Sequence, residues 1–170
     1  MSQLGNRLVV TQRRRIKRKN TRESILPLRE LEKNLKGSPS YLGAIYVSSF
    51  KSLVVKSRRY SFLIYCNHHW IVLYCTENNI EIFDSLGFLT TKSCVTQNVL
   101  NFIRNQIGSR NFKANRTIQS SSSKLCGIYA LYYILKRDNG YSFDKIMNNF
   151  TNNLTDNDNL MRRFFNKLSQ

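Results

Sequence analysis

The sequence predicts an α+β fold, in which a small, mostly antiparallel central sheet is flanked by helices. Two runs rich in aromatic and β-branched residues, 60–66 and 69–75, lie in the middle of the chain and have the composition of strands. The segments before and after them carry apolar residues at helical spacing. A chain of 170 residues, 41% of them hydrophobic, is long enough for one domain with a sizeable core.

The first helix is predicted over residues 23–36. Its apolar side chains recur every three or four positions and form one stripe, consisting of Ile25, Leu28, Leu31 and Leu35. Gly37, Ser38 and Pro39 follow directly, and this combination is typical of a helix end.

The strands predicted over 60–66 and 69–75 are apolar on both faces, which is typical of a sheet that helices cover on both sides. Asn78 and Asn79 have strong turn propensity. Residues 80–83 are therefore the strand that returns beside 69–75.

Four more helices are expected in the second half of the chain. Residues 95–107 are amphipathic, 108–124 form a polar loop with a short strand, and 126–136 are apolar at helical spacing. Ser142 and Asp156 are the predicted N-caps of two closing helices. The last helix should turn three apolar residues inward and three basic residues outward: Leu160, Phe164 and Leu168, and Arg162, Arg163 and Lys167.

Basic charge is concentrated near the start of the chain. The net charge is +17, and the first 40 residues hold 11 basic and 3 acidic side chains. The densest run contains Arg13, Arg14, Arg15, Lys17, Arg18 and Lys19. This run lacks an apolar face, so we predict a flexible basic arm over 1–22 and a folded domain over 23–170. The arm is expected to contact DNA, to serve as a nuclear import signal, or to be a solvated tail without a specific partner.

No apolar stretch reaches the ~18 residues that a membrane-spanning helix needs, and the first ten residues lack the apolar core of a secretory signal. We therefore expect an intracellular or packaged protein without a membrane partner. Cys66, Cys75, Cys94 and Cys126 contain no CxxC pair, so neither a metal site nor a disulfide framework is expected. Cys66 and Cys75 are predicted to be small buried hydrophobes.

A polar pair stands at the ends of two predicted strands. His69 opens strand 69–75 and is followed by Trp70, the only tryptophan, while Asp84 closes the returning strand. In a hairpin these two residues can be cross-strand neighbours. A carboxylate beside an imidazole orients it and keeps it basic. His68 is a second candidate for the base, but it lies at the more exposed mouth of the strand.

Cys126 is predicted to begin a helix, and Gly127 follows it. At a helix N-terminus the macrodipole and the free N–H groups stabilise a thiolate, and they can also hold an oxyanion. Gly127 would let a substrate backbone come close. Gln119, seven residues upstream, could add a second oxyanion donor. Each of these residues alone is common in cores and loops, and Trp70 is as readily a core aromatic as a channel residue.

The sequence resembles the adenovirus-type maturation proteases, the adenains, and more widely the ubiquitin-like-protein proteases that cleave SUMO precursors. The matching stretches are His69-Trp70, Phe83-Asp84-Ser85-Leu86-Gly87-Phe88, Gln119 with Cys126-Gly127, and Gly37-Ser38-Pro39-Ser40-Tyr41-Leu42-Gly43. The spacing from Gln119 to Cys126 is that of adenain. The closing segment 147–168 is similar more loosely, so the resemblance covers most of 30–170 and leaves 1–22 unmatched.

The resemblance implies a papain-like, adenain-like cysteine protease fold with Cys126 as nucleophile and Trp70 and Gly127 lining a narrow substrate channel. It implies an endopeptidase that processes capsid or core precursor proteins at sites with small residues, chiefly glycine. It further implies DNA as an activating polyanion and a place in the virion and the host nucleus. No metal is required for this chemistry, and we expect a monomer.

Three departures from adenain matter. Asp84 stands where adenain has Glu, but the SUMO proteases use Asp, so the acid's role is retained. Ser85 replaces the proline that follows this acid in adenain. Adenain is activated by a short peptide through a disulfide, and Cys94 cannot be matched to the cysteine concerned. Whether a peptide activator exists therefore stays open.

Other interpretations stay open as well. A SUMO or ubiquitin-like-modifier protease would use the same catalytic residues. A non-enzymatic, basic DNA-binding protein would explain the charge but not the order of His, Asp, Gln and Cys, and the chain has no helix-turn-helix or zinc signature. An inactive relative with the same fold would not need the complete set of four residues.

Overall fold

The computed structural model describes residues 25–47, 55, 57–88 and 97–170. The arm predicted over 1–22, with its DNA-binding residues Arg13, Arg14, Arg15, Lys17, Arg18 and Lys19, lies outside the described residues. Cys94 and Val95 lie outside them too. Among the described helices, none is long and apolar enough to cross a membrane.

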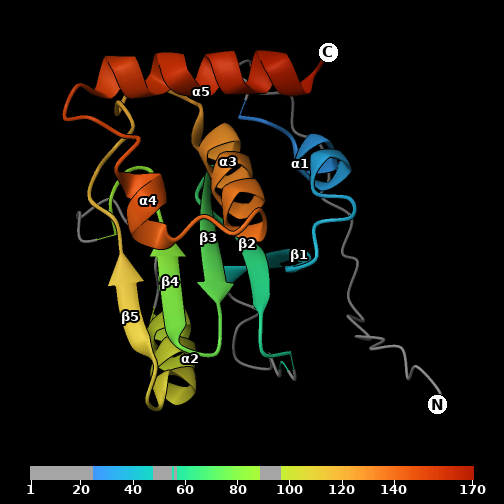
Figure 1. Cartoon of the computed structure of the whole chain (residues 1–170), viewed down its shortest axis with the longest axis vertical. Coiled ribbons are helices and arrows are strands. Elements are labelled where there is room, and N and C mark those ends of the chain that lie inside the picture. Colours follow the sequence, from blue (N-terminus) through green and yellow to red (C-terminus); the bar gives the residue numbers. More distant parts are fainter. Residues whose placement is uncertain (1–24, 48–54, 56, 89–96) are drawn as a thin grey trace.

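A five-stranded mixed sheet forms the centre of the molecule, in the order β1-β2-β3-β4-β5 (Figure 1). The strands are β1 (Tyr41–Tyr46), β2 (Tyr60–Cys66), β3 (His69–Cys75), β4 (Asn79–Phe83) and β5 (Asn111–Ala114). Both pairings of β3 are antiparallel, whereas β1 runs parallel to β2, and β5 runs parallel to β4. The prediction of a mostly antiparallel sheet is therefore wrong. The chain crosses over between β4 and β5 through helix α2 (Gln97–Ile107), and a crossover brings the next strand back in the same direction.

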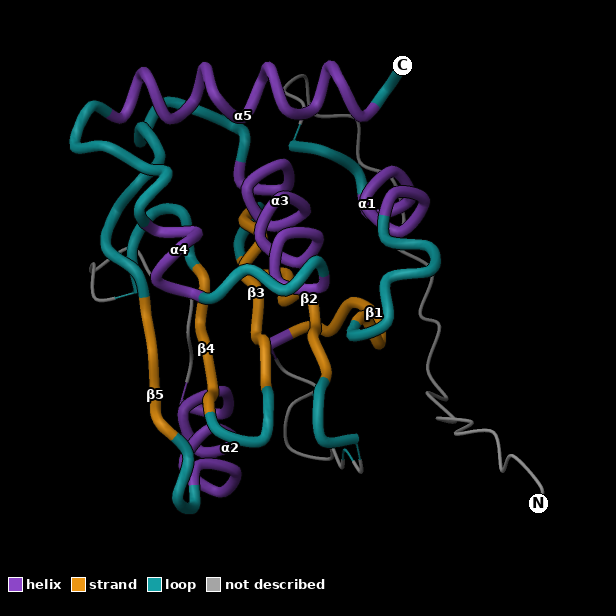
Figure 2. The backbone as a smooth tube through the Cα atoms, in the orientation of Figure 1, coloured by secondary structure: helices purple, strands orange, loops and turns teal. Residues whose placement is uncertain are grey.

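Helices cover both faces of this sheet, as the apolar strands predicted (Figures 1 and 2). Helix α3 (Cys126–Asp138) lies along one face, and α2 lies behind the other. The remaining helices are α1 (Leu28–Asn34), α4 (Phe143–Met147) and α5 (Leu154–Leu168). In Figure 1, α5 runs across one end of the molecule, over the start of α3.

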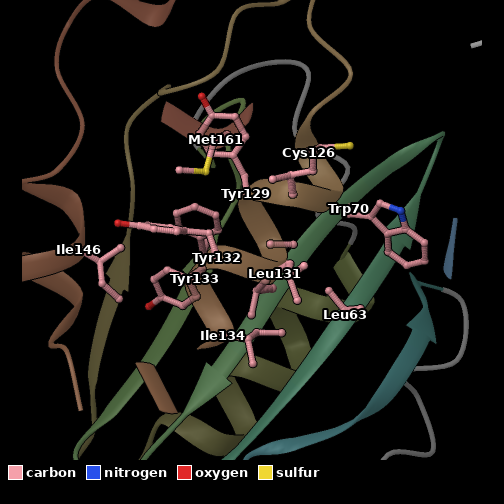
Figure 3. Packing of buried hydrophobic residues seen from close by; sticks show 14 of the residues in the cluster. Leu63, Trp70, Cys126, Tyr129, Leu131, Tyr132, Tyr133, Ile134, Ile146 and Met161 are labelled. Carbon is pink, nitrogen blue, oxygen red and sulfur yellow. The ribbon is translucent and has the colours of Figure 1, made fainter. Parts of the chain in front are cut away.

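Each face of the sheet carries its own apolar core. Leu63 and Val72 pack with α3 on one side, and Figure 3 shows α3 residues lying over Leu63. Phe62 and Ile71 pack with α2 on the other side. Every residue of β3 is buried, so this strand is the centre of the fold. Side chains alternate between faces along a strand, which explains why both faces of β2 and β3 had to be apolar.

Two helix starts differ from the predictions. Helix α1 begins at Leu28 and not at 23, because Pro27 occupies the N-cap and the residue before a proline is driven out of the helical conformation. Helix α5 begins at Leu154, and Asn153 is its N-cap: the Asn153 side chain accepts from the backbone N–H groups of Thr155 and Asp156. The prediction of Asp156 as N-cap is therefore wrong.

The other predicted features of the closing helices are largely confirmed. Ser142 is the N-cap of α4, where its side chain accepts from Lys145 N–H. Leu160 and Phe164 pack against the core. Leu168 is an exception with 39% of its surface exposed, because it lies in the last turn of α5. The three basic residues predicted to face outward, Arg162, Arg163 and Lys167, are exposed.

A buried polar network fixes the C-terminal part of α3 to β4. The Glu81 carboxylate accepts from the Tyr133 hydroxyl at 2.5 Å and from Arg137 Nε at 2.8 Å. A second Arg137 nitrogen donates to the other Glu81 oxygen at 3.0 Å. Buried charges are retained in proteins when they are paired in this way. The network therefore sets the position of α3, and with it the position of Cys126 at the other end of the helix.

Candidate active site

His69 and Asp84 meet through their side chains. Nε2 of His69 lies 2.7 Å from Oδ1 of Asp84, and both residues are buried. They are not register partners, because the β3–β4 ladder ends at the pair Val72 and Phe83. Asp84 follows the last paired residue of β4, and its side chain reaches His69 diagonally. The predicted neighbourhood is confirmed, although direct cross-strand pairing is not.

The Asp84 carboxylate is held in place by backbone and side-chain contacts. Its Oδ1 also accepts from Leu86 N–H at 2.9 Å. Asn115 bonds to both backbone polar groups of Asp84: its Oδ1 accepts from Asp84 N–H at 2.8 Å, and its Nδ2 donates to the Asp84 carbonyl at 2.7 Å. Oδ2 of Asp84 is buried and accepts no hydrogen bond from the described residues. The interaction with His69 is therefore concentrated on one oxygen.

Cys126 opens α3, as predicted. Its N-cap, Leu125, provides no side-chain cap, so side chains leave the first N–H groups of the helix available. The Cys126 side chain points away from Tyr129 and Met161 in Figure 3, and only 3% of the residue is exposed. A helix N-terminus favours the thiolate over the thiol.

The side chain of Cys126 is close enough to interact with the imidazole of His69 and to raise its pKa. Asp84 occupies Nε2 of the ring, so Nδ1 is the nitrogen left for another partner. Burial disfavours the charged imidazole, but the hydrogen bonds and negative charges of Asp84 and Cys126 outweigh it and raise the pKa of His69 to about 9. The site thus favours the protonated, imidazolium form of His69.

The Gln119 side chain is buried next to the loop that leads into α3. Its Nε2 donates to the Ser123 carbonyl at 2.7 Å, and its Oε1 accepts from Ser85 Oγ at 2.5 Å. The backbone N–H of Gln119 donates to the Ser85 carbonyl at 2.9 Å. An amide nitrogen carries two hydrogens, so one of them is left for another acceptor. Ser85 and Asn115 are residues of this region that sequence reasoning missed.

Trp70 and Gly127 lie together beside Cys126, but a third residue lies with them. Trp70 Nε1 donates to the Leu26 carbonyl at 3.2 Å. A Cβ added to Gly127 would lie 3.0 Å from the Leu26 Cβ and 3.3 Å from the Trp70 ring. The group that lies close to Gly127 is thus Leu26 of the same chain, and the approach of a substrate backbone stays a prediction.

His68, the second candidate for the base, lies outside this arrangement. Asn67 and His68 have positive φ angles of 44° and 63° and form the tight turn between β2 and β3. His68 is exposed, and its Nδ1 lies 3.2 Å from the Tyr65 hydroxyl. The Tyr65 ring in turn packs on Trp70, with centroids 4.7 Å apart. Tyr65 is a further residue of this region that the sequence analysis did not single out.

The other cysteines in the described part of the chain are buried in the sheet. Cys66 and Cys75 belong to β2 and β3, as predicted, and burial raises the pKa of Cys75 to about 11. Within the described ranges, no three His, Cys, Asp or Glu residues lie close enough together to hold a metal ion.

Comparisons with known proteins provide little beyond this geometry. No protein-family model matches the chain, and no curated protein does. One similar solved structure is the central domain of the uncharacterized Lpg1148 protein from Legionella pneumophila. It shares 14% identity over 75% of this chain and 85% of that chain, with a TM-score of 0.43. Function therefore has to be argued from the site itself.

Proposed function

We propose that this protein is a cysteine endopeptidase with Cys126 as nucleophile and His69 as base. The observation that carries the proposal is one buried cluster, in which Asp84 bonds one nitrogen of His69 and Cys126, at a helix N-terminus, interacts with the same imidazole. This is the arrangement of nucleophile, base and orienting group that acyl transfer needs. The resemblance of the sequence motifs to those of the adenains and SUMO proteases supports the same function. On this proposal the chain also has a papain-like fold.

The reaction would proceed by acyl transfer. The Cys126 thiolate attacks the scissile carbonyl, and its former proton resides on His69. The tetrahedral oxyanion is stabilised by the Cys126 backbone N–H and by the second hydrogen of Gln119 Nε2. His69 then protonates the leaving amine, and a water molecule activated by the neutral imidazole hydrolyses the thioester. Asp84 holds the ring so that one nitrogen faces the sulfur throughout.

The substrates proposed are structural precursor proteins with small residues, chiefly glycine, at the cleaved bond, as the resemblance to the adenains implies. DNA is the proposed activating polyanion, since a net charge of +17 favours binding to phosphates. On this proposal, the protein acts in virions and in the host nucleus. A modifier protease would act on ubiquitin-like tails with the same four residues.

The proposal is tested with the full-length protein and two fluorogenic substrates, a glycine-containing precursor peptide and a ubiquitin-like modifier tail, each with and without duplex DNA. Cleavage of the precursor peptide by the wild type, with loss in Cys126→Ala, is expected. Preference for the modifier tail would favour the alternative protease. The non-enzymatic alternative would be supported if Cys126→Ala and the wild type were equally inert while both bound DNA.

A further inference from the structure

Ser85 connects two parts of the candidate site. Its hydroxyl bonds Gln119 Oε1 at 2.5 Å, and both side chains are buried, each residue with 1% of its surface exposed. Its carbonyl accepts from the N–H groups of Ile118 and Gln119, both at 2.9 Å. Ser85 directly follows Asp84 in the chain. One residue of this pair therefore bonds the proposed base, His69, and the other bonds the proposed oxyanion donor, Gln119.

The surroundings determine which way round the Gln119 amide lies. The Ser123 carbonyl can only accept, so the nitrogen of the amide has to face it, at 2.7 Å. Ser123 precedes Cys126 by three residues, and the nitrogen therefore lies toward the loop that enters α3. The oxygen end faces Ser85, which consequently has to donate its proton.

We propose that Ser85 is a positioning residue that holds the Gln119 amide with its nitrogen toward the oxyanion, a role that rests on the proposed function. Without the Ser85 hydroxyl, the buried Oε1 loses its donor, and a buried polar atom without a partner is unfavourable. The amide can then rotate away from the orientation that the transition state needs. The effect acts on the transition state more than on substrate binding, so it falls on kcat and not on KM.

The test is a double-mutant cycle with Ser85→Ala and Gln119→Ala on the full chain, measured with the precursor peptide. Gln119→Ala is expected to lower kcat by about 10²-fold, as loss of one oxyanion donor typically does. Ser85→Ala is expected to lower kcat by about 10-fold in the wild type and to have no further effect in the Gln119→Ala background. Equal effects in both backgrounds, or an unchanged kcat in Ser85→Ala, would overturn the proposal.

Two controls separate positioning from general damage. Ser61→Ala removes another fully buried hydroxyl, bonded at 2.9 Å to Ser40 Oγ, and should leave kcat and KM within twofold of wild type. Ser85→Thr and Ser85→Val add the same branched bulk, but only threonine keeps the hydroxyl, so threonine should be the faster of the two by about 10-fold. Equal rates in this pair would contradict the role of the hydroxyl. Full activity in Cys126→Ala would instead overturn the proposed function.

A separate observation concerns Leu26. Its carbonyl accepts from Trp70 Nε1 at 3.2 Å, and its side chain fills the space over Gly127, where a Cβ would have only 3.0 Å to the Leu26 Cβ. A peptide cannot pass between surfaces that already touch. Cys126 and Trp70 are only 3% and 4% exposed, and Leu26 occupies the space over Gly127, the residue next to Cys126.

We infer that Leu26 is an intramolecular occupant of the substrate channel, and that substrate has to displace it; this too rests on the proposed function. The indole N–H that now binds the Leu26 carbonyl would then be free to bind a substrate carbonyl. An occupant competes with substrate, so its removal tightens substrate binding. A fixed channel wall that contacts substrate behaves in the opposite way, since its removal weakens binding.

Removing Leu26 should tighten substrate binding if it is an occupant and weaken it if it is a channel wall, so the direction of the change distinguishes the two roles. A peptidyl-glycine chloromethyl ketone is used as the probe on full-length protein, and the inactivation rate and half-saturating concentration are measured at Cys126 by mass spectrometry. Leu26→Gly is expected to lower the half-saturating concentration by about fivefold, the value of a partly buried leucine contact. Leu28→Gly is the matched control: Leu28 packs on the same core, but the carbonyl that Trp70 Nε1 bonds and the Cβ nearest to Gly127 both belong to Leu26. It should leave this concentration unchanged.

An unchanged or higher half-saturating concentration in Leu26→Gly would overturn the occupant role. Should Leu26→Gly be poorly folded, Trp70→Phe is the second variant: it keeps an aromatic ring but removes the N–H that anchors the Leu26 carbonyl. It should then raise the labelling rate of Cys126 by iodoacetamide, a small reagent that reports access to the sulfur without depending on peptide binding. An unchanged rate would count against the occupant. No labelling of Cys126 in any protein would contradict the proposed function.

Discussion

Nε2 of His69 and Oδ1 of Asp84 lie 2.7 Å apart, and the bond between them joins the start of β3 to the residue that follows β4. The geometry leaves Nδ1 of His69 for Cys126. The other carboxylate oxygen, Oδ2, is buried without a partner among the described residues. The carboxylate therefore acts on His69 through Oδ1 alone. Changes at this atom should therefore have large effects on chemistry.

Asp84→Asn is expected to lower kcat by roughly 10²–10⁴-fold, the range that positioned acid–base groups contribute. The neutral amide keeps the size of the side chain but removes the charge that favours the imidazolium. Steady-state kinetics with the glycine-containing peptide provide the measurement. Asn115→Asp serves as a comparison, since it keeps the size of a second buried side chain while replacing the amide that donates to the Asp84 carbonyl at 2.7 Å. A wild-type kcat in Asp84→Asn would show that the acid is misassigned.

The pH profile follows from the pKa of His69, which is raised from 6.5 to about 9. Activity should fall as pH rises through about 9, because the imidazolium that protonates the leaving amine is lost. The same shift stabilises the fold: the contribution is fully present below pH 6.5 and disappears as pH rises through about 9. In Asp84→Asn, the basic limb of kcat/KM should move to lower pH. A limb that stays in place would exclude Asp84 as a cause of the raised pKa.

Cys126 should react with thiol reagents well before Cys75. Burial raises the pKa of Cys75 to about 11, so at neutral pH it is a protonated thiol, and only the thiolate is nucleophilic. Cys126 lies at a helix N-terminus and interacts with His69. Limited labelling at pH 7 followed by peptide mapping measures the order, and His69→Ala should slow the labelling of Cys126 alone. Faster reaction at Cys75 would contradict the assignment of the nucleophile.

Arg137→Met should lower the free energy of unfolding by about 3–5 kcal/mol, as expected when one partner of a buried ion pair is removed. Glu81 would keep its charge and lose two of its hydrogen bonds. Urea unfolding monitored by tryptophan fluorescence measures the change. Lys113→Met is the control: it breaks an ion pair with Asp144, whose side chain is 70% exposed, and should cost about 1 kcal/mol or less. Similar losses in the two variants would argue against the network as the anchor of α3.

DNA binding should be shared between the arm and the folded domain. Replacing the six basic residues between Arg13 and Lys19 by Gln leaves 21 basic against 10 acidic side chains. Affinity for duplex DNA should drop and the slope of log affinity against log salt should become shallower, because fewer counterions are released. Fluorescence anisotropy over a salt series provides both quantities. Complete loss of binding would mean that the arm is the whole DNA site.

Much of the centre of the fold could be predicted from sequence because local signals determine it. The apolar runs of β2 and β3 and the helix that begins at Cys126 agree with the structure at their starts. The parallel pairings of β1 and β5 could not be predicted, since they depend on how the crossovers pack and not on the strands' own residues. Asn153 and Asp156 are both good capping residues, and the structure places Asn153 at the N-cap, where its side chain accepts from Thr155 and Asp156 N–H.

In the candidate site, too, contacts that local sequence determines could be predicted, and contacts that depend on distant segments could not. The contact of His69 with Asp84 was predictable, because a short hairpin brings the ends of its strands together. Ser85 and Asn115 were missed, because a polar residue in a loop has no periodic signal and takes its importance from partners distant in sequence. The position of Leu26 was not predicted, because Leu26 lies within the helix predicted over residues 23–36 and outside its apolar stripe. Only Pro27 signals that the helix starts later.

The site is assembled from four separate stretches of chain: the start of β3, the end of β4, the loop after β5 and the first turn of α3. A chain still emerging from the ribosome has its proposed base long before its nucleophile. Helix α3 is tied to α5 only when the Tyr129 hydroxyl can bond Asp158, at 2.9 Å. On the proposed function, a nascent chain should therefore gain activity only after α5 has been synthesised.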